Sequence, residues 1–315
     1  MSDEIYQGRN GWLFFVGKSK SIYRYYSDPN YFNSEHARGW LDVLRRRRDI
    51  LNRAGIRYFH IGAPDKISVY PERLNLPLPY LERHPLNVVS QEWGRLGEPP
   101  VLINPLQAFN EHPKRDSLYL KTHSQWTYMG GMVVLGLTLD AIGAHREVSL
   151  AGREVRVCEP FRGLPDSLYG SIDEQTIFVV PRQYVRRAAA NALAEQFEAR
   201  IPLGKPAFST GINVVFINDD PGAIDETLVI FGDSFSDFRP SSLTFQFAEV
   251  FREVHFVWSP SIDYSYIARA DATLVITETA ERSMIQVPDD QFDVDAEVYW
   301  RMIDYGRELQ PMSPV

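Results

Sequence analysis

The residues best suited to chemistry follow an apolar run in the last third of the chain. Residues 227–238 read Thr-Leu-Val-Ile-Phe-Gly-Asp-Ser-Phe-Ser-Asp-Phe, which predicts a buried strand over 227–231 and a turn that carries Ser234. In an open parallel sheet, ligands collect beyond the carboxyl ends of the strands. A serine there presents its hydroxyl to a crevice, and its own N–H can stabilise an oxyanion. We therefore predict that Ser234 is the working residue; the alternative is that Ser234 and Ser236 only cap the next helix.

The elements that would position this serine alternate along the chain. Apolar, β-branched runs predict strands over 56–61, 101–103, 227–231, 254–257 and 273–276, and helical periodicity covers 36–54, 124–142, 242–252 and 295–308. This alternation indicates an α/β protein with a mainly parallel sheet covered on both faces. The pattern breaks over 146–220, where short extended pieces (155–157, 177–180 and 213–217) surround one helix over 186–200. We expect one domain, 1–315, with 146–220 as a partly β insertion.

Composition excludes several classes of function. The net charge of −8 and the pI near 5.5 argue against nucleic acid as the main partner. The one basic run, Arg45 to Arg48, falls in an expected helix and is interpreted as a solvated face. A single cysteine, Cys158, rules out an internal disulfide and a cysteine-based metal site. The sequence contains no phosphate loop, dinucleotide fingerprint or His-rich motif, so we expect neither a metal nor a bound cofactor.

The start of the chain and its apolar stretches bear on localisation. The first residues, Met-Ser-Asp-Glu, lack the features of a signal peptide, and the longest apolar stretch, 130–139, is far shorter than the roughly 20 residues that span a bilayer. We expect a soluble, cytoplasmic protein without a membrane span. The alternative is a periplasmic protein from which an export signal has been removed.

Five short segments, in chain order, carry a family resemblance. They are Gly-Arg-Asn-Gly-Trp-Leu-Phe-Phe (8–15), Ala-Pro-Asp-Lys-Ile-Ser-Val-Tyr-Pro-Glu (63–72), Tyr-Leu-Lys-Thr-His-Ser-Gln-Trp (119–126), Gly-Asp-Ser-Phe (232–235) and Glu-Thr-Ala-Glu-Arg (278–282). Together they resemble the motifs of the SGNH-hydrolase-like O-acetyltransferases of the alginate AlgX/AlgJ type. The resemblance implies a flavodoxin-like, three-layer α/β/α SGNH-hydrolase-like fold. It also implies transfer of an acetyl group from a serine acyl-enzyme to a carbohydrate acceptor in polysaccharide or glycoconjugate modification.

The resemblance also implies a donor of the acetyl group. Members of this family receive it outside the cytoplasm from a membrane partner, so an acyl-donor protein is an expected partner. A cytoplasmic relative would need a soluble donor such as acetyl-CoA, for which the sequence shows no recognisable site.

One departure from the family pattern affects the catalytic base. Aligned on Lys121 and Trp126, His123 stands where the family has the orienting Asp, and Gln125 stands where it has the basic His. A glutamine does not accept a proton from serine. Three alternatives follow: His123 is the base and Gln125 positions groups or donates to the oxyanion; His60 is the base; or the site only binds a glycan or a partner.

Four further residues are predicted on the substrate side of the site: Gly232, Asp233, Lys66 and Trp126. Lys66 follows the first strand and would contact an anionic or carbonyl group, unless it is simply solvated. Asp233 either meets the substrate or fixes the turn through backbone contacts. The leading hypothesis is a carbohydrate O-acetyltransferase acting through Ser234; the alternatives are a non-catalytic glycan-binding or assembly protein and a simple carbohydrate esterase.

Overall fold

The computed structural model describes residues 5–17, 22–158, 174–201, 207–240 and 242–308. Within these residues, seven strands form one mixed sheet in the order β4-β3-β11-β9-β10-β8-β7. Neighbours from β4 to β10 are parallel, whereas β8 and β7 are antiparallel to their neighbours. The large, mostly parallel sheet predicted from the alternating pattern is therefore present. The strands are β3 (Arg57–Ala63), β4 (Leu102–Ile103), β7 (Val185–Ala190), β8 (Asn213–Asn218), β9 (Ile224–Gly232), β10 (Phe251–Trp258) and β11 (Leu274–Ala280).

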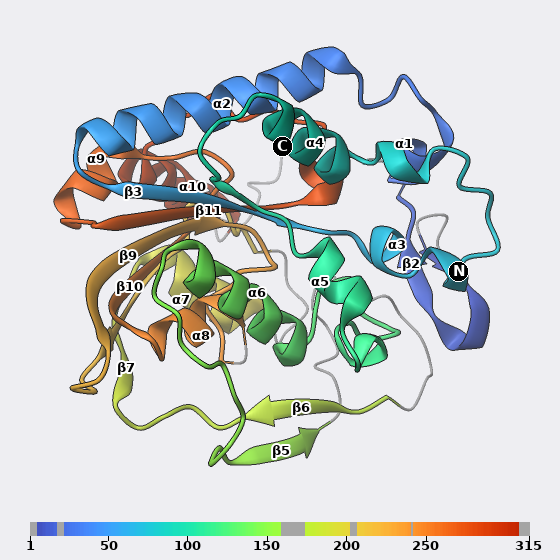
Figure 1. Cartoon of the computed structure of the whole chain (residues 1–315). Coiled ribbons are helices and arrows are strands. Elements are labelled where there is room, and N and C mark those ends of the chain that lie inside the picture. The colour runs from blue at the N-terminus through green and yellow to red at the C-terminus, as the bar shows by residue number, and fades with distance from the viewer. Residues whose placement is uncertain (1–4, 18–21, 159–173, 202–206, 241, 309–315) are drawn as a thin grey trace, which may run out of the picture.

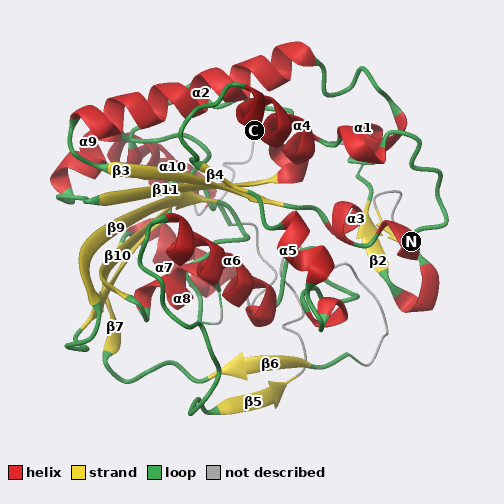
Figure 2. Ribbon diagram, viewed as in Figure 1, coloured by secondary structure: helices red, strands yellow, loops and turns green. Residues whose placement is uncertain are grey.

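Helices lie on both sides of this sheet (Figure 2). On one side are α2 (Ser34–Arg53), α4 (Pro85–Arg95) and α9 (Tyr264–Arg269), and on the other are α6 (Tyr128–Ala141) and α8 (Leu243–Ala248). The longest helix, α2, begins after Asn33, whose side chain accepts from the N–H groups of Glu35 and His36. Trp40 and Leu44 of α2 are fully buried. The core therefore lies between the sheet and the helices on each side.

The connections between strands diverge next to β9. Numbered in chain order, the five parallel strands β3, β4, β9, β10 and β11 are strands 1 to 5, so the sheet order from β4 to β10 reads 2-1-5-3-4. One connection leaves β9 for β10 on one side, and the next crosses to β11 on the other. In open α/β sheets, ligands bind where the connections to neighbouring strands diverge, beyond the carboxyl ends of the strands. That position lies between the ends of β9 and β11.

Shorter elements complete the chain (Figure 1). Two strand pairs flank the sheet: β1 (Ile5–Gln7) with β2 (Leu13–Phe15), and β5 (Val155–Cys158) with β6 (Thr176–Val179), both antiparallel. The remaining α-helices are α1 (Arg24–Ser27), α3 (Lys66–Val69), α5 (Leu106–Glu111), α7 (Ala192–Arg200) and α10 (Val294–Glu308). Trp12 and Phe14 are fully buried, and the Trp12 ring lies 4.3 Å from that of Tyr70. The N-terminal aromatic segment therefore packs against the domain.

Single-turn 3-10 helices occupy the loops. They are η1 (Arg9–Gly11), η2 (Pro71–Arg73), η3 (Leu81–Arg83), η4 (Arg115–Ser117) and η6 (Glu281–Ser283). The last of these directly follows β11, at the edge of the sheet where β9 ends.

The segment 146–220 contributes to the main sheet, because β7 and β8 extend its antiparallel edge. The helix predicted over 186–200 is wrong in its first half, since Val185–Ala190 forms β7 and α7 starts at Ala192. The alanines of this stretch favour a helix by propensity, but pairing with β8 overrides that preference. Asn191 caps the shortened helix by accepting from the N–H of Ala194.

Two other predicted helices have different ends. The helix predicted over 242–252 ends at Ala248, and Phe251 already begins β10. The helix predicted over 124–142 starts only at Tyr128, because Thr127 takes an extended conformation and its hydroxyl accepts from the N–H of Gly130. Residues 124–126 are thereby left in a loop.

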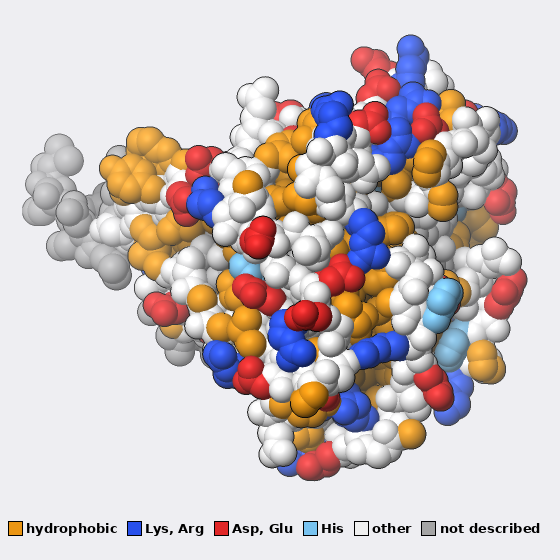
Figure 3. All heavy atoms as spheres, turned by 60° about the vertical axis from the view of Figure 1, so that its left-hand side comes forward, with side chains coloured by type: hydrophobic (Ala, Val, Ile, Leu, Met, Phe, Trp, Pro, Cys, Tyr) orange, Lys and Arg blue, Asp and Glu red, His pale blue; other side chains and the backbone are white. Residues whose placement is uncertain are grey.

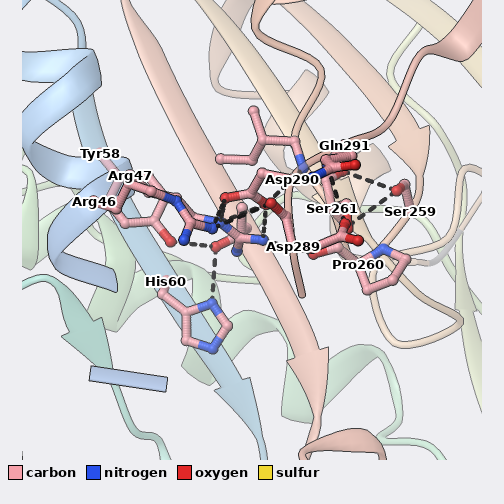
Figure 4. A network of polar contacts seen from close by, with 12 residues as sticks. Arg46, Arg47, Tyr58, His60, Ser259, Pro260, Ser261, Asp289, Asp290 and Gln291 are labelled. Carbon is pink, nitrogen blue, oxygen red and sulfur yellow. Dashed lines mark hydrogen bonds and ion pairs between the residues drawn. The ribbon is translucent and has the colours of Figure 1, made fainter. Parts of the chain in front are cut away.

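The basic run on α2 is only partly a solvated face, which corrects the sequence interpretation. Arg47 is fully buried, and its guanidinium donates to the Asp290 carboxylate (2.6 Å) and to the Pro260 carbonyl (2.8 Å). Figure 4 shows this network, with Arg46 also reaching Asp290. Four consecutive residues of a helix make about one turn, so one of the four arginines faces the interior. This residue, Arg47, connects α2 to segments more than 200 residues away.

Acidic and basic side chains are interspersed on the face of the molecule in Figure 3. Among the described residues, no helix is long and apolar enough to cross a membrane.

Candidate active site

Ser234 lies in a turn directly after β9, beyond the carboxyl end of the strand and next to the end of β11. Asp233 holds the turn, because its carboxylate accepts from the N–H of Phe235 (3.0 Å) and from that of Ala280 (3.0 Å). The Ser236 N–H also donates to the Asp233 carbonyl (3.1 Å). Asp233, predicted on the substrate side, therefore fastens the serine turn to β11.

A buried carboxyl group supports the turn from below. Glu278, at the end of β11, is 1% exposed, and one of its oxygens accepts from the Asp233 N–H and from the Ser236 hydroxyl, both at 3.0 Å. Burial, together with the nearby Asp233 carboxylate, raises the pKa of Glu278 well above its ordinary value. The carboxyl of Glu278 therefore keeps its proton to a higher pH than an exposed glutamic acid does, and its oxygen accepts both hydrogen bonds.

Gly232 is required by the close packing of this carboxyl. A Cβ at Gly232 would lie 2.9 Å from the Ser236 hydroxyl and 3.0 Å from a Glu278 oxygen. These separations are shorter than ordinary contacts, so any side chain here would push the turn away from β11. Gly232, also predicted on the substrate side, shapes the turn from within.

The Ser234 side chain is available for chemistry. The residue is half-buried, and neither its hydroxyl nor its N–H has a hydrogen-bond partner among the residues that the structure describes. Its carbonyl, in contrast, accepts a 2.6 Å hydrogen bond from the Gln125 side-chain amide. The hydroxyl and the N–H of Ser234 are therefore both without a partner among the described residues.

His123 and Gln125 are both buried, at 7% and 8% exposed, in the loop before α6. The Gln125 N–H donates to Nδ1 of His123 (3.2 Å), so in the neutral ring the proton is on Nε2. His123 and Ser234 share no hydrogen bond in this arrangement. The structure thus brings Gln125 directly to the serine turn, while a base role for His123 stays a prediction.

Aromatic packing and a buried lysine hold the His123 loop in place. The Trp126 ring packs edge-on against Phe235 at 4.8 Å, next to Ser234. Lys66 is 3% exposed, and its ammonium donates to the carbonyls of Leu120 (2.8 Å) and Lys121 (2.9 Å). Burial lowers the pKa of Lys66 well below its ordinary value. Both residues therefore contact the protein itself, at the two ends of the loop that carries His123.

His60, the alternative base, lies inside the sheet. It is fully buried on β3, where Nδ1 is 2.8 Å from the Thr277 hydroxyl and the ring packs beside Trp40 of α2. Burial and the nearby Arg47 lower the pKa of His60 to about 3. Figure 4 shows it beside the Arg47 network. The ring is thus part of the core between β3 and α2, away from the carboxyl edge of the sheet.

Sequence reasoning missed the part played by Glu278. The segment Glu-Thr-Ala-Glu-Arg (278–282) carries part of the family resemblance, but only the strand pairing shows that Glu278, two residues before the end of β11, lies beside the serine turn. A carboxylate near the end of a strand that begins with an apolar run is the available signal, because a buried acid in that position needs hydrogen-bond donors nearby.

Comparison with known proteins gives a likeness in fold. No protein-family model matches the sequence, and no curated protein matches it. The fold resembles PatB1 of Bacillus cereus (TM-score 0.62, 14% identity, covering 90% of this chain and 99% of that one). It also resembles a DHHW family protein of Eubacterium siraeum (0.56, 15%, 90% and 95%) and the O-acetyltransferase domain of Pseudomonas putida AlgJ (0.53, 15%, 94% and 97%). These identities establish similarity of fold only.

Proposed function

We propose that this protein is a carbohydrate O-acetyltransferase that carries the acetyl group on Ser234, within a single flavodoxin-like α/β/α domain of the SGNH-hydrolase type. The observation that carries the proposal is that neither the hydroxyl nor the N–H of Ser234, at the divergence point between β9 and β11, has a hydrogen-bond partner among the described residues. The fold likeness to an O-acetyltransferase domain, that of AlgJ, supports the class of reaction.

The proposed reaction has two balanced steps. The Ser234 hydroxyl attacks the acetyl carbonyl of a donor, gives its proton to a base, and the donor's leaving group departs with a proton. A sugar hydroxyl then attacks the acetyl-serine carbonyl, the sugar ester forms, and the hydroxyl of Ser234 is restored. The Ser234 N–H would stabilise the oxyanion in both steps. The partners are a carbohydrate acceptor and an acyl donor, either a donor protein or a soluble thioester such as acetyl-CoA.

His123 is the proposed base, and this role requires a rearrangement. Because Nδ1 accepts from the Gln125 N–H, the neutral ring presents a protonated Nε2, which donates and does not accept. The ring must therefore exchange its nitrogens, by turning about its Cβ–Cγ bond or by losing the Gln125 contact, before it takes a proton from Ser234. Catalytic hydrogen bonds often tighten only in the complex with substrate.

The same observation favours a second candidate function. A site whose Gln125 amide binds the serine carbonyl, with no histidine on the hydroxyl, suits a non-catalytic glycan-binding or assembly protein on the same fold. That function predicts saturable oligosaccharide binding that is unchanged in Ser234→Ala.

Acetyl transfer distinguishes the candidates. The protein is incubated with p-nitrophenyl acetate and a panel of oligosaccharides, and sugar acetate esters are measured by mass spectrometry beside Ser234→Ala. Transferase activity predicts sugar esters with the native chain and none with the variant. Release of acetate without sugar esters would identify an esterase. If neither sugar esters nor acetate exceed the background of the variant, both the transferase and the esterase hypotheses are contradicted.

A sulfonyl fluoride provides an independent probe of the nucleophile. A solved structure of PatB1, similar in fold to this chain (TM-score 0.61), carries a sulfonyl adduct. If Ser234 is activated, a sulfonyl fluoride should modify this residue, and the adduct should be absent from Ser234→Ala. Modification of other serines to the same extent would contradict selective activation.

A further inference from the structure

A polar pocket lies away from the serine turn. It has a volume of about 310 Å³, and its lining comes entirely from residues 68–115, around α3, α4 and α5. In Figure 1 these helices lie where β3 runs out of the sheet into α3. None of the residues that form the Ser234 turn or the His123 loop lines this pocket. A volume of this size suits a small ligand of about one ring.

An oriented histidine lines the pocket. His84 is 3% exposed, and its Nδ1 is bound to a carboxylate oxygen of Glu281, which is fully buried. The second oxygen of Glu281 accepts from the Asp65 N–H (2.9 Å) and from the Ser68 hydroxyl (2.7 Å). Burial acts to raise the pKa of Glu281, but His84 and these donors lower it overall, so the carboxylate is ionised. The ring of His84 is therefore fixed at Nδ1.

The other nitrogen of His84 is left for a ligand. Among the described residues, Nε2 has no hydrogen-bond partner, and it is not among the fully enclosed polar atoms that lack one. A carboxylate that holds one imidazole nitrogen sets the direction of the other, as in many binding and catalytic sites. This histidine belongs to neither the serine site nor the core network of α2.

The charges around the pocket favour a neutral ligand. Arg115 lines it, but its guanidinium is already paired with the Glu72 carboxylate (3.1 Å) and stacks over the Tyr70 ring. The Glu281 carboxylate lies against His84, and the exposed Glu82 also lines the pocket. Since the Arg115 guanidinium already has an acidic partner and two further carboxylates are close, an anion would gain little here.

The walls of the pocket suit an amphipathic ring. Pro71, Leu81 and Leu106 supply apolar surface, whereas Asn87 and Asn110 supply amide groups. Apolar walls with a few fixed polar groups are typical of small-molecule sites. A sugar ring offers both kinds of surface, because its C–H groups pack on aliphatic side chains and its hydroxyls form hydrogen bonds.

We propose that this pocket binds a neutral, hydroxyl-bearing ligand of the class of a single monosaccharide unit, with Nε2 of His84 as a fixed hydrogen-bond partner. The choice of a sugar as the ligand rests on the proposed carbohydrate function. The pocket and the orientation of His84 are observed in the structure and do not depend on that function. The protein would then hold its glycan at a second point, separate from Ser234.

The experiment titrates the full chain, labelled with ¹⁵N-histidine, with methyl glycosides of common hexoses and N-acetylhexosamines up to about 50 mM, since a ligand of this size binds with a millimolar Kd. The His84 imidazole signals are assigned with His84→Gln. We expect a saturable shift of these signals with at least one glycoside. No shift with any glycoside, or a stronger response to sodium acetate than to every glycoside, would overturn the proposal.

A rim variant keeps the test valid if His84→Gln does not fold. Asn110→Trp, on the exposed rim, should fill the pocket and weaken the glycoside response at least tenfold. The matched control is Asn52→Trp, on the exposed face of α2, which should leave the response unchanged. An equal response in Asn110→Trp and the native chain would show that the sugar binds elsewhere and overturn the assignment.

Ser234→Ala separates this proposal from the proposed function. The variant should lose acetyl transfer and keep the His84 response. A His84 response without any acetylation of Ser234 would support sugar binding in the pocket and contradict the transferase function. Acetyl transfer without a His84 response would contradict only sugar binding in the pocket.

Discussion

The side chain of Gln125 is a hydrogen-bond donor, whereas the family resemblance implies a base at this position. The Gln125 amide donates to the Ser234 carbonyl, so it touches the backbone of the serine turn and not its hydroxyl. An imidazole at the same position would lie beside the serine and carry an acceptor. The chemistry of the site therefore depends on whether the neighbouring His123 takes over proton transfer.

Gln125→His tests whether this position addresses the serine. A general base typically contributes about 10²–10⁴-fold to rate, so we expect Gln125→His to raise Ser234-dependent hydrolysis of p-nitrophenyl acetate at least tenfold at neutral pH. The gain should disappear in the double variant Gln125→His/Ser234→Ala. A rate equal to that of the native chain, with the fold intact, would show that position 125 does not reach the reacting hydroxyl.

Glu278 makes a pH-dependent contribution with a defined sign. Burial and Asp233 raise its pKa in the folded chain above the ordinary 4.5, so above about pH 4.5 the folded state binds more protons than the unfolded one. Stability must then fall as pH rises from 4.5 through the folded pKa. A glutamine at this position is always neutral, so the Glu278→Gln variant does not lose stability in this way. The free energy of unfolding of the variant, relative to that of the native chain, should therefore increase with pH over that range.

Urea unfolding at several pH values measures this difference, which should grow by at most about 1.4 kcal/mol per pH unit. Glu111→Gln, at an exposed position of α5, is the control and should show no such trend. A stability difference that is flat with pH would mean that Glu278 is already ionised in the folded chain.

Among the helices and strands, the sequence predicts those that have a local apolar pattern. It does not predict features that depend on which strands pair. The strand that ends at the serine turn, and the other four parallel strands, follow from short apolar runs that tertiary contacts reinforce. β7 was missed because its alanines favour a helix and only the adjacent β8 makes it a strand. Likewise, Glu278 could be seen in the sequence, but its place beneath the turn follows from the pairing of β11 with β9.

The β9 turn should not tolerate a side chain at its first residue. In Gly232→Ala the new Cβ would lie about 3 Å from Ser236 and Glu278, so the turn must move. We expect destabilisation of about 1–3 kcal/mol in urea unfolding and loss of any Ser234-dependent acylation. Gly94→Ala is the matched control, because a Cβ there meets open space on helix α4 and should leave stability unchanged or higher. Equal behaviour of the two variants would refute the close packing at Gly232.

At the scale of the whole molecule, the site depends on the order of the strands. The divergence point between β9 and β11 is a property of the sheet, and no single segment of the sequence reveals it. The sequence predicted a mainly parallel sheet but not which strands are neighbours, because that choice is made by long-range packing. The same holds for Arg47. A run of four arginines predicts an exposed helix face, and only the packing of the helix against the loops at Pro260 and Asp290 shows that one of them is buried.

The Arg47–Asp290 pair should be a major contributor to overall stability. Arg47→Met leaves the Asp290 carboxylate buried beside fewer donors, since both side chains are at most 3% exposed. Breaking such a pair costs about 3–5 kcal/mol. Arg46→Met is the control, because that side chain is 43% exposed and the expected loss is below about 1 kcal/mol. Urea unfolding of both variants measures the difference, and equal losses would contradict the buried tie.

The proposed function depends on acetylation of Ser234. The most direct measurement is the mass of the protein after brief incubation with p-nitrophenyl acetate and acid quenching, followed by peptide mapping. We predict one added acetyl group per chain, located on Ser234 and absent from Ser234→Ala. An unmodified chain under conditions in which the fold is intact, or an acetyl group that persists unchanged in Ser234→Ala, would contradict the claim.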